Sequence, residues 1–350
     1  MRKIISTTLK YLIPVAIGVG LFYFLYKNVN IDQMKSVLAT DVNYWWFLPV
    51  VVVSTFSHIF RACRWRLQLR AIGVDAPLSA IVNSIFGTYA VNLIFPRLGE
   101  VWRTGYIADR QRASFTTVLG SMVADRLTDT ITVLALTVIT FFIAQEAFFR
   151  FLDTYPQLQE GLVGLLTSPW TWVCVAVCAG ALVWLFKNKT GNPIVAKVRT
   201  MVANLWQGFS GVAKMEGKWW FLLYTVLIWG CYFLQLYIAT FAFSFTAHIG
   251  IVATLVLFVL SSIGMGVPTN GGLGAWHIAI IFGLSLYGIG AFDPSNFDPN
   301  ASAFAMLVWG VQTLLLIVLG IYAFSYMAID RKRIKQGKVT VKASGTGMQL

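Results

Sequence analysis

The chain of 350 residues is 57% hydrophobic and only 12% charged, which is about half the charged fraction of a typical soluble domain. This composition excludes a soluble globular protein and indicates several membrane-spanning helices. The formal net charge is +13, but the basic residues lie in short clusters beside apolar segments. We therefore attribute the charge to membrane topology and expect no nucleic-acid partner.

Apolar segments that approach or exceed the roughly 20 residues needed to cross a bilayer recur along the whole chain. They are residues 11–26, 45–60, 115–144, 169–186, 219–245, 249–267, 273–289 and 301–327. The first follows basic residues, as a signal peptide would, but no A-x-A-like cleavage site comes after it, so we expect a membrane anchor. The sequence thus predicts an all-α polytopic membrane protein with six to eight transmembrane helices.

The basic residues predict which ends of these segments face the cytoplasm. A topology with both termini inside places nearly all of the 27 lysines and arginines in the cytoplasm, as the positive-inside rule requires. Besides the termini, its cytoplasmic segments are residues 61–70, 97–112 and 187–218. The exceptions are Lys27, Lys35 and Arg150, which lie outside, and Arg126, which lies within an apolar segment.

A further apolar segment, residues 77–95, has arginines on both sides. Because both flanks belong to the same face of the membrane, we predict that this segment is a re-entrant hairpin, broken near Gly87. Non-helical backbone at membrane depth requires protein or a wet cavity to satisfy its polar groups. The hairpin therefore implies a cavity, and we expect residues 96–103 to form part of its cytoplasmic mouth.

A second break, "GMGVPTNGGLGAWH", interrupts the apolar sequence at residues 264–277. It carries Pro268, Asn270, Gly271, Gly272 and Gly274. Residues 249–289 either cross the membrane twice or form a second re-entrant pair, and the charges do not distinguish the two. Both breaks contain a P-x-x-G core, at Pro96 and at Pro268. Paired Gly/Pro interruptions are typical of transporters built from inverted repeats, so we infer a possible internal repeat.

Charged side chains follow the first break directly. Helical spacing places Arg97, Glu100 and either Arg103 or Thr104 on one face. One interpretation is a cytoplasmic surface helix with an ordinary ion pair. The other is a helix that begins at the mouth of the cavity, where its N-terminal dipole and its arginines attract a phosphate. The re-entrant segment just before it favours the second interpretation.

The segment of residues 114–144 would be about 46 Å long as a helix, which exceeds the hydrocarbon thickness. It contains Asp125, Arg126 and Asp129. These residues either lie in the cytoplasmic interface or belong to a tilted helix that lines an aqueous vestibule. In the second case Arg126 and Asp129, three residues apart, would pair and reduce the cost of burial.

The remaining candidates point to few chemical functions. His277 either carries protons or is structural, and no histidine or cysteine has metal-ligand spacing, so we expect no metal or other cofactor. Residues 192–209 form an amphipathic pattern, which predicts a helix on the cytoplasmic leaflet. Residues 328–350 read as a flexible basic cytoplasmic tail. No P-loop, serine-nucleophile or zinc-protease motif is present, so we expect a protein that is not an enzyme.

Several of these motifs carry a resemblance. The run N-x-x-x-P-R-x-G-E-x-x-R begins at Asn92, D-R-x-x-D begins at Asp125, and P-x-x-G-G-x-G begins at Pro268. Together they resemble the flippase-like transmembrane region of lysylphosphatidylglycerol synthases and their stand-alone relatives. The resemblance covers residues 1–327, nearly the whole chain, and implies a protein that moves lipids between leaflets of a bacterial inner membrane.

In some members of that family a fused cytosolic domain attaches the amino acid to the lipid, and this chain shows no such domain. We therefore expect it to move, rather than make, an anionic or modified envelope phospholipid with a phosphate head group. The resemblance implies a path lined by Asn92, Arg97, Glu100, Arg103, Asp125, Arg126, Asp129, Asn270, Gly271, Gly272 and His277. Two alternatives remain open: a membrane-embedded enzyme acting on a lipid phosphate, and a non-catalytic partner of a separate lipid-modifying or glycan-modifying enzyme.

Overall fold

The computed structural model describes residue 16 and residues 19–27, 29–154, 156–187 and 217–338. Their regular structure is helical, with two isolated bridges, from Val29 to Phe297 and from Val42 to Phe243. The helices are α2 (Ile31–Thr40), η1 (Tyr44–Trp46), α3 (Phe47–Ala71), α4 (Leu78–Ile94), α5 (Leu98–Gln111), α6 (Phe115–Ile143), α7 (Gln145–Thr154), α8 (Pro156–Thr167), α9 (Pro169–Lys187), α11 (Lys218–Thr240), α12 (Gly250–Gly264), η2 (Asn270–Gly272), α13 (Ala275–Ser285) and α14 (Pro299–Lys335).

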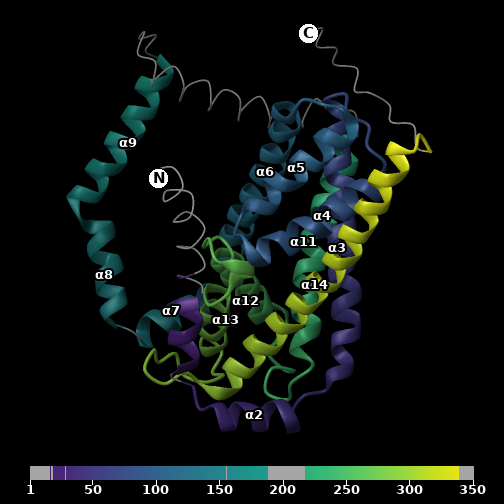
Figure 1. The fold of residues 1–350 in the computed structure, drawn as a ribbon. Coiled ribbons are helices and arrows are strands. Elements are labelled where there is room, and N and C mark those ends of the chain that lie inside the picture. The colour runs from purple at the N-terminus through teal and green to yellow at the C-terminus, as the bar shows by residue number, and fades with distance from the viewer. Residues whose placement is uncertain (1–15, 17–18, 28, 155, 188–216, 339–350) are drawn as a thin grey trace, which may run out of the picture.

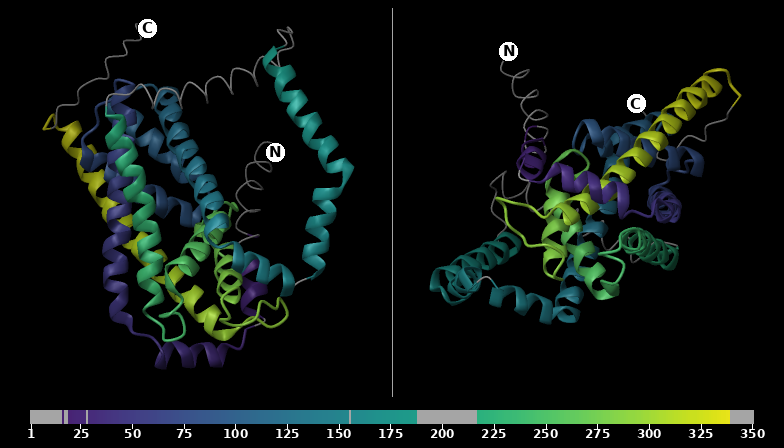
Figure 2. Two further views of the ribbon diagram at one scale, coloured as in Figure 1. Left: turned by 180° about the vertical axis from the view of Figure 1, so that it is seen from behind. Right: turned by 90° about the horizontal axis from the view of Figure 1, so that it is seen from below.

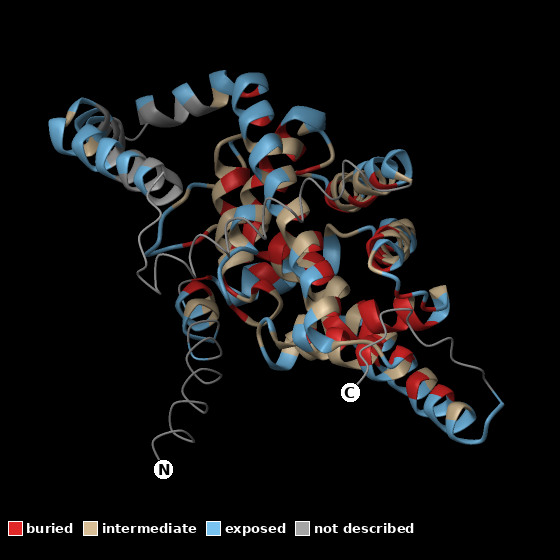
Figure 3. Cartoon of the chain, turned by 90° about the horizontal axis from the view of Figure 1, so that it is seen from above, coloured by how far each residue is buried: buried red, intermediate tan, exposed pale blue. Residues whose placement is uncertain are grey.

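Four helical segments of the described chain are long and apolar enough to cross a membrane. They are Tyr44–Ala71, Phe115–Ile143, Lys218–Thr240 and Pro299–Lys335. Figure 3 shows their buried residues facing neighbouring helices and their exposed residues on the outer sides. On α6, for example, Leu134, Val138 and Phe142 form an exposed stripe at helical spacing, as expected for a helix that contacts lipid. The prediction of an all-helical membrane protein is confirmed.

The predicted hairpin within residues 77–95 is wrong in its boundaries. Residues 78–94 form one uninterrupted helix, α4, and the chain reverses after it, at Phe95 to Arg97. The first hairpin therefore consists of α4 and α5. Gly87 does not break α4; a Cβ atom there would lie 2.5 Å from the ring of Trp102 on α5, so this glycine lets the two helices pack closely.

The second break forms a second hairpin, made of α12 and α13. At 15 and 11 residues, these helices are about 22 and 16 Å long, and neither can cross a bilayer core of about 30 Å. These lengths favour the second of the two predicted arrangements, a re-entrant pair, which stays a prediction. Gly271, Gly272 and Gly274 all have positive φ angles of 57–80°, which glycine adopts without steric cost.

The two hairpins enter the bundle from opposite ends and meet at their tips (Figure 1). Both P-x-x-G cores lie at these tips, Pro96 in the first and Pro268 in the second. Equivalent breaks in oppositely directed hairpins agree with the inverted repeat that the sequence suggested. The number of crossings remains a prediction, because most of the first apolar segment lies outside the described residues.

The ends of the bundle differ from each other (Figures 1 and 2). Helix α2 lies across one end, beside the start of α14, while the first hairpin and the end of α14 lie at the other. The tail predicted from residue 328 is wrong in its first part, since α14 continues to Lys335 and Asp330 accepts hydrogen bonds from Arg110 at 2.7 and 3.1 Å. The predicted helix at residues 192–209 lies outside the described part of the chain.

Candidate functional site

Seven charged side chains from three helices come together beside the first hairpin. We call them the charged cluster: Arg61 and Arg64 on α3, Glu100 and Arg103 on α5, and Asp125, Arg126 and Asp129 on α6. The sequence placed the last five among the candidate residues. Their convergence follows from the first hairpin, in which α5 packs against α6 while α3 packs against α4 and α6.

Arg64 is the central cation of the charged cluster and is completely buried. Its guanidinium donates to Asp125 Oδ1 from Nε at 3.0 Å and from Nη2 at 2.6 Å, and Nη2 also lies 2.7 Å from Asp129 Oδ1. Arg61, one turn earlier on α3, donates to Asp129 Oδ2 at 2.5 Å. The two arginines of α3 and the two aspartates of α6 thus form a four-membered ion network, which offsets much of the desolvation cost of each charge.

Arg103 was expected near a cavity mouth, but the structure buries it. Its Nη2 donates to Asp125 Oδ2 at 3.2 Å, and its guanidinium carbon lies 4.4 Å from the ring centroid of Trp65. That distance is within the range of a cation–π contact. The indole nitrogen of Trp65 in turn donates to Ser121 at 3.1 Å, so this arginine is held between an aromatic face and a carboxylate.

The Asn92, Gly99 and Glu100 positions of the sequence motif hold the first hairpin together. The side-chain oxygen of Asn92 accepts from Gly99 N at 2.8 Å, and its nitrogen donates to Glu100 Oε2 at 3.2 Å. The other oxygen of Glu100 pairs with Arg126. The motif therefore shapes the hairpin and, in the same contacts, connects it to α6.

Arg126 is the accessible cation of the charged cluster. Its side chain is 34% exposed, whereas those of Arg61, Arg64 and Arg103 are 0–3% exposed. The predicted pairing of Arg126 with Asp129 within the helix is present at 3.6 Å, and Glu100 is its closer partner. Any ligand that approaches the charged cluster can thus reach Arg126 without displacing the buried arginines.

Arg97, Asn270 and Gly271 lie at the junction of the hairpin tips instead of in the charged cluster. Arg97 precedes α5 in a left-handed conformation with φ 63°, and its Nη2 donates to the carbonyl of Gly266 at 2.6 Å. Gly271 accepts from the indole of Trp309 at 2.8 Å. Arg97 therefore contacts the opposite hairpin while its side chain stays exposed, and the cytoplasmic mouth expected at residues 96–103 stays a prediction.

Glycine is required at two positions of the second tip. A Cβ atom at Gly271 would lie 2.8 Å from Leu93, and one at Gly272 would lie 2.3 Å from the sulfur of Met265. Such distances are too short for real Cβ contacts, and both residues also have positive φ angles. Gly271 thus allows the two tips to approach each other, Gly272 allows the second tip to pack against Met265, and neither offers a side chain to a substrate.

His277 lies apart from both groups, at the start of α13. Its side chain is completely buried, and its Nδ1 accepts from Gly274 N at 3.3 Å. Aromatic rings surround it, with centroids 5.2–5.9 Å away: Phe22, Tyr26, Trp276 and Trp309. The contact with Gly274 shows that His277 caps α13.

Polar contacts continue from the charged cluster along α11. Tyr232 OH lies 3.4 Å from Arg61 Nη2 and 3.2 Å from Tyr89 OH. One turn further, Gln235 accepts from Gln312 at 3.3 Å, and Gln312 accepts from Ser54 at 2.8 Å. A polar route thus extends inside the bundle from the charged cluster toward the second hairpin.

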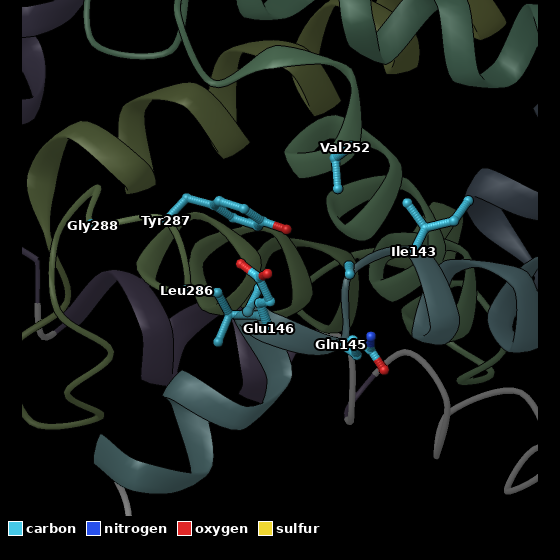
Figure 4. Close-up of a pocket in the computed structure, with 9 residues that line it drawn as sticks. Ile143, Gln145, Glu146, Val252, Leu286, Tyr287 and Gly288 are labelled. Atoms are coloured by element: carbon cyan, nitrogen blue, oxygen red, sulfur yellow. The ribbon is translucent and has the colours of Figure 1, made fainter.

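A pocket of about 510 Å³ lies at the C-terminal end of α6 (Figure 4). It is lined by Ile143, Ala144, Gln145, Glu146, Ala147, Val252, Leu286, Tyr287 and Gly288. None of the candidate residues predicted from the sequence lines it. We therefore treat the charged cluster, rather than this pocket, as the candidate functional site.

The sequence reasoning missed Arg61 and Arg64, which it assigned to a basic cytoplasmic segment. A signal was present: the two arginines are three residues apart at the end of an apolar segment, and the two aspartates of α6 are four residues apart. Both spacings place side chains on one helix face. Two helices that each carry such a pair can satisfy each other's charges inside a membrane.

Comparisons with known proteins agree with this architecture. Searches of curated proteins and of solved structures find no significant match. A family model does match, over residues 11–321, and its description is lysylphosphatidylglycerol synthase TM region. This region includes both hairpins and the whole charged cluster. The chain therefore belongs to the lysylphosphatidylglycerol synthase TM region family, whose members are integral membrane domains linked to lipid modification.

Proposed function

We propose that this protein moves a phospholipid between the two leaflets of a bacterial cytoplasmic membrane, with its N- and C-termini in the cytoplasm. The head group would pass the charged cluster and the hairpin tips while the acyl chains stay in the bilayer. We further propose that it performs no covalent chemistry on the lipid. The observation that carries this function is the charged cluster itself, buried among helices yet open at Arg126.

Charged groups inside a membrane are expensive and are retained where a polar substrate or ion must pass. The cluster places seven of them on α3, α5 and α6, and the contacts of Tyr232 and Gln312 continue the polar surface beyond it. A phospholipid needs both kinds of surroundings to cross the membrane, because its charged head group requires a polar path and its uncharged tails require lipid. A polar path beside lipid-facing helices suits such a substrate.

The hairpin tips support the same function for a different reason. The two hairpins meet at their tips inside the bundle, and few hydrogen bonds join the tips in the described part of the chain: they come from Arg97 of the first hairpin and from Asn270 of the second. Breaking a few contacts costs less than moving a whole transmembrane helix. The junction can therefore separate to let a head group pass and then close again.

Leaflet exchange in proteoliposomes tests the proposal. Fluorescent phosphatidylglycerol is placed in both leaflets, and a membrane-impermeant quencher reports the fraction that reaches the outer leaflet. We expect exchange with the unaltered protein and its loss with Arg126→Ala. Arg331→Ala is the matched control, because Arg331 is 70% exposed and pairs with Asp109 outside the cluster. Absence of exchange by the folded, unaltered protein would contradict the proposal.

Analysis of the recovered lipids distinguishes transport from the enzymatic alternative. Transport leaves the phosphatidylglycerol chemically unchanged, whereas an enzyme acting on the phosphate produces a lipid of different mass. Mass spectrometry of lipids extracted after the exchange reaction should therefore show only the starting material. A product whose formation requires Arg126 would replace transport with catalysis as the function.

A further inference from the structure

We propose that the charged cluster binds a phosphate group and excludes cationic amines, so that the protein carries an anionic lipid and not an aminoacylated one. The identity of the lipid rests on the proposed function, but phosphate binding can be tested without any transport. The group recognised is a phosphate, whether it belongs to a lipid head group or is free in solution. The inference follows from how the donors and acceptors of the cluster are used.

The carboxylate oxygens of the cluster are all occupied. Both oxygens of Asp125 and both of Asp129 contact buried arginines at 2.5–3.2 Å. Glu100 pairs with Arg126 through one oxygen and accepts from Asn92 through the other. An ammonium group needs acceptors, and every carboxylate oxygen of the cluster already faces a guanidinium group or the Asn92 amide, so an amine would add a positive charge beside donors that are already in place.

The arginines, in contrast, have donors to spare. Four guanidinium nitrogens of the charged cluster are buried without a hydrogen-bond partner in the described structure: Nε of Arg61, Nε and Nη1 of Arg103, and Nε of Arg126. Buried donors that lack a partner are costly. The oxygens of an ionised phosphate accept hydrogen bonds and donate none, so a phosphate complements these unpaired donors.

The charge balance points in the same direction. Within the described cluster four arginines face three carboxylates, which leaves one positive charge in excess. A cationic ligand would increase this excess in a region of low dielectric constant, whereas a phosphodiester would neutralise it. Electrostatics alone thus favours a singly charged anion.

Arg126 determines where the anion binds. It is the exposed guanidinium, and Glu100 occupies it from one side. A phosphate that binds Arg126 would replace Glu100 as the partner of this guanidinium group. Glu100 would still accept the hydrogen bond from the Asn92 amide. Glu100 therefore competes with the ligand, and removing its charge should strengthen binding rather than weaken it.

Binding to the full chain purified in detergent tests this proposal. Radiolabelled short-chain phosphatidylglycerol is the probe, and inorganic phosphate and lysylphosphatidylglycerol are the competitors. We expect Arg126→Gln to weaken binding at least tenfold and Glu100→Gln to strengthen it several-fold. Arg331→Gln, at an exposed ion pair outside the cluster, should leave binding unchanged. Thermal unfolding of each variant shows whether it is folded.

The outcomes separate the anion site from the proposed function. Tight binding of phosphatidylglycerol with weak competition by inorganic phosphate supports a lipid head group. Equal competition by inorganic phosphate supports the anion site but assigns it to free phosphate, against lipid transport. Lysylphosphatidylglycerol that binds as tightly as phosphatidylglycerol, or Glu100→Gln that weakens binding, would overturn the inference even if leaflet exchange is observed.

Discussion

Asn270 on the second hairpin donates its side-chain amide to the carbonyls of Leu93 and Ile94 on the first, at 3.0 and 2.9 Å. Helix ends leave carbonyl groups without intrahelical partners, and one asparagine satisfies two of them at the end of α4. A polar side chain in an apolar segment thus has a structural explanation. The same contact makes Asn270 a direct test of how firmly the tips are joined.

Replacing Asn270 with alanine should loosen the tip junction. The change removes both hydrogen bonds and leaves two carbonyls of α4 without a donor, at a cost of about 1–3 kcal/mol. We expect a lower unfolding temperature and altered leaflet exchange in the same proteoliposome assay. Asn296→Ala is the control, because Asn296 lies exposed in the loop before α14. Equal stability of Asn270→Ala and the unaltered protein would show that the tips do not depend on this contact.

Gly99 offers a sharper test of the first hairpin. A Cβ atom at this position would lie 2.1 Å from the carbonyl oxygen of Thr88 and 2.8 Å from Asn92 Oδ1. Gly99→Ala must therefore push α5 away from α4, and we expect a large loss of folded protein on size-exclusion chromatography. Gly105→Ala lies on the same helix, where the nearest atom is 4.0 Å away.

The control should be neutral or slightly stabilising, because alanine favours a helix by up to about 1 kcal/mol over glycine. Comparable yields of Gly99→Ala and Gly105→Ala would mean that the two helices do not pack as closely as the structure places them. Both variants replace glycine with alanine on the same helix, so helix propensity changes equally in each. A difference between them therefore reports the close contact of the α4 and α5 backbones.

The first hairpin also shows what sequence can predict and where it stops. The arginines on both sides of residues 77–95 predict that the chain returns to the same face, and in the structure the two flanks do lie together, since Gln111 at the end of α5 donates to the carbonyl of Asp75 before α4 at 2.7 Å. The position of the turn was wrong because Gly87 was taken as a break. A glycine breaks a helix or lets another helix approach, and only the contact with Trp102 distinguishes the two roles.

The charged cluster illustrates a second limit. Asp125 and Arg126 are conspicuous in an apolar segment, so the α6 half of the site could be predicted. Arg61 and Arg64 are not, because arginines near the end of a predicted span also satisfy the positive-inside rule. Partners that are distant in the chain, such as Arg64 and Asp125, are joined only by tertiary packing.

Asp125 should be the residue on which the cluster depends most for stability. It contacts Arg61, Arg64 and Arg103 and is completely buried. Asp125→Asn keeps the shape but removes the charge that faces three guanidinium groups, so we expect a loss of about 3–5 kcal/mol. Unfolding in detergent, followed by circular dichroism, measures it.

Asp75→Asn serves as the matched exchange for this measurement. Asp75 pairs with Arg70 at 2.9 Å, but both side chains are about half exposed, and such pairs contribute about 0–1 kcal/mol. If Asp125→Asn and Asp75→Asn lower the free energy of unfolding equally, burial does not strengthen the ion pairs of the cluster. A larger loss for Asp75→Asn would contradict the assignment of Asp125 as the central carboxylate.

The topology can be tested on the two ends of the bundle. Helix α2 lies at one end and the C-terminal turns of α14 at the other (Figure 1), and α14 ends in a basic stretch that contains Arg333. The positive-inside rule therefore places Arg333 in the cytoplasm and Lys35, on α2, outside. In a background without native cysteines, Lys35→Cys should react with an impermeant maleimide on intact cells. Arg333→Cys should react only after the membrane is permeabilised. The reverse pattern would show that the topology is opposite to the predicted one, and that the charged cluster is reached from the other leaflet.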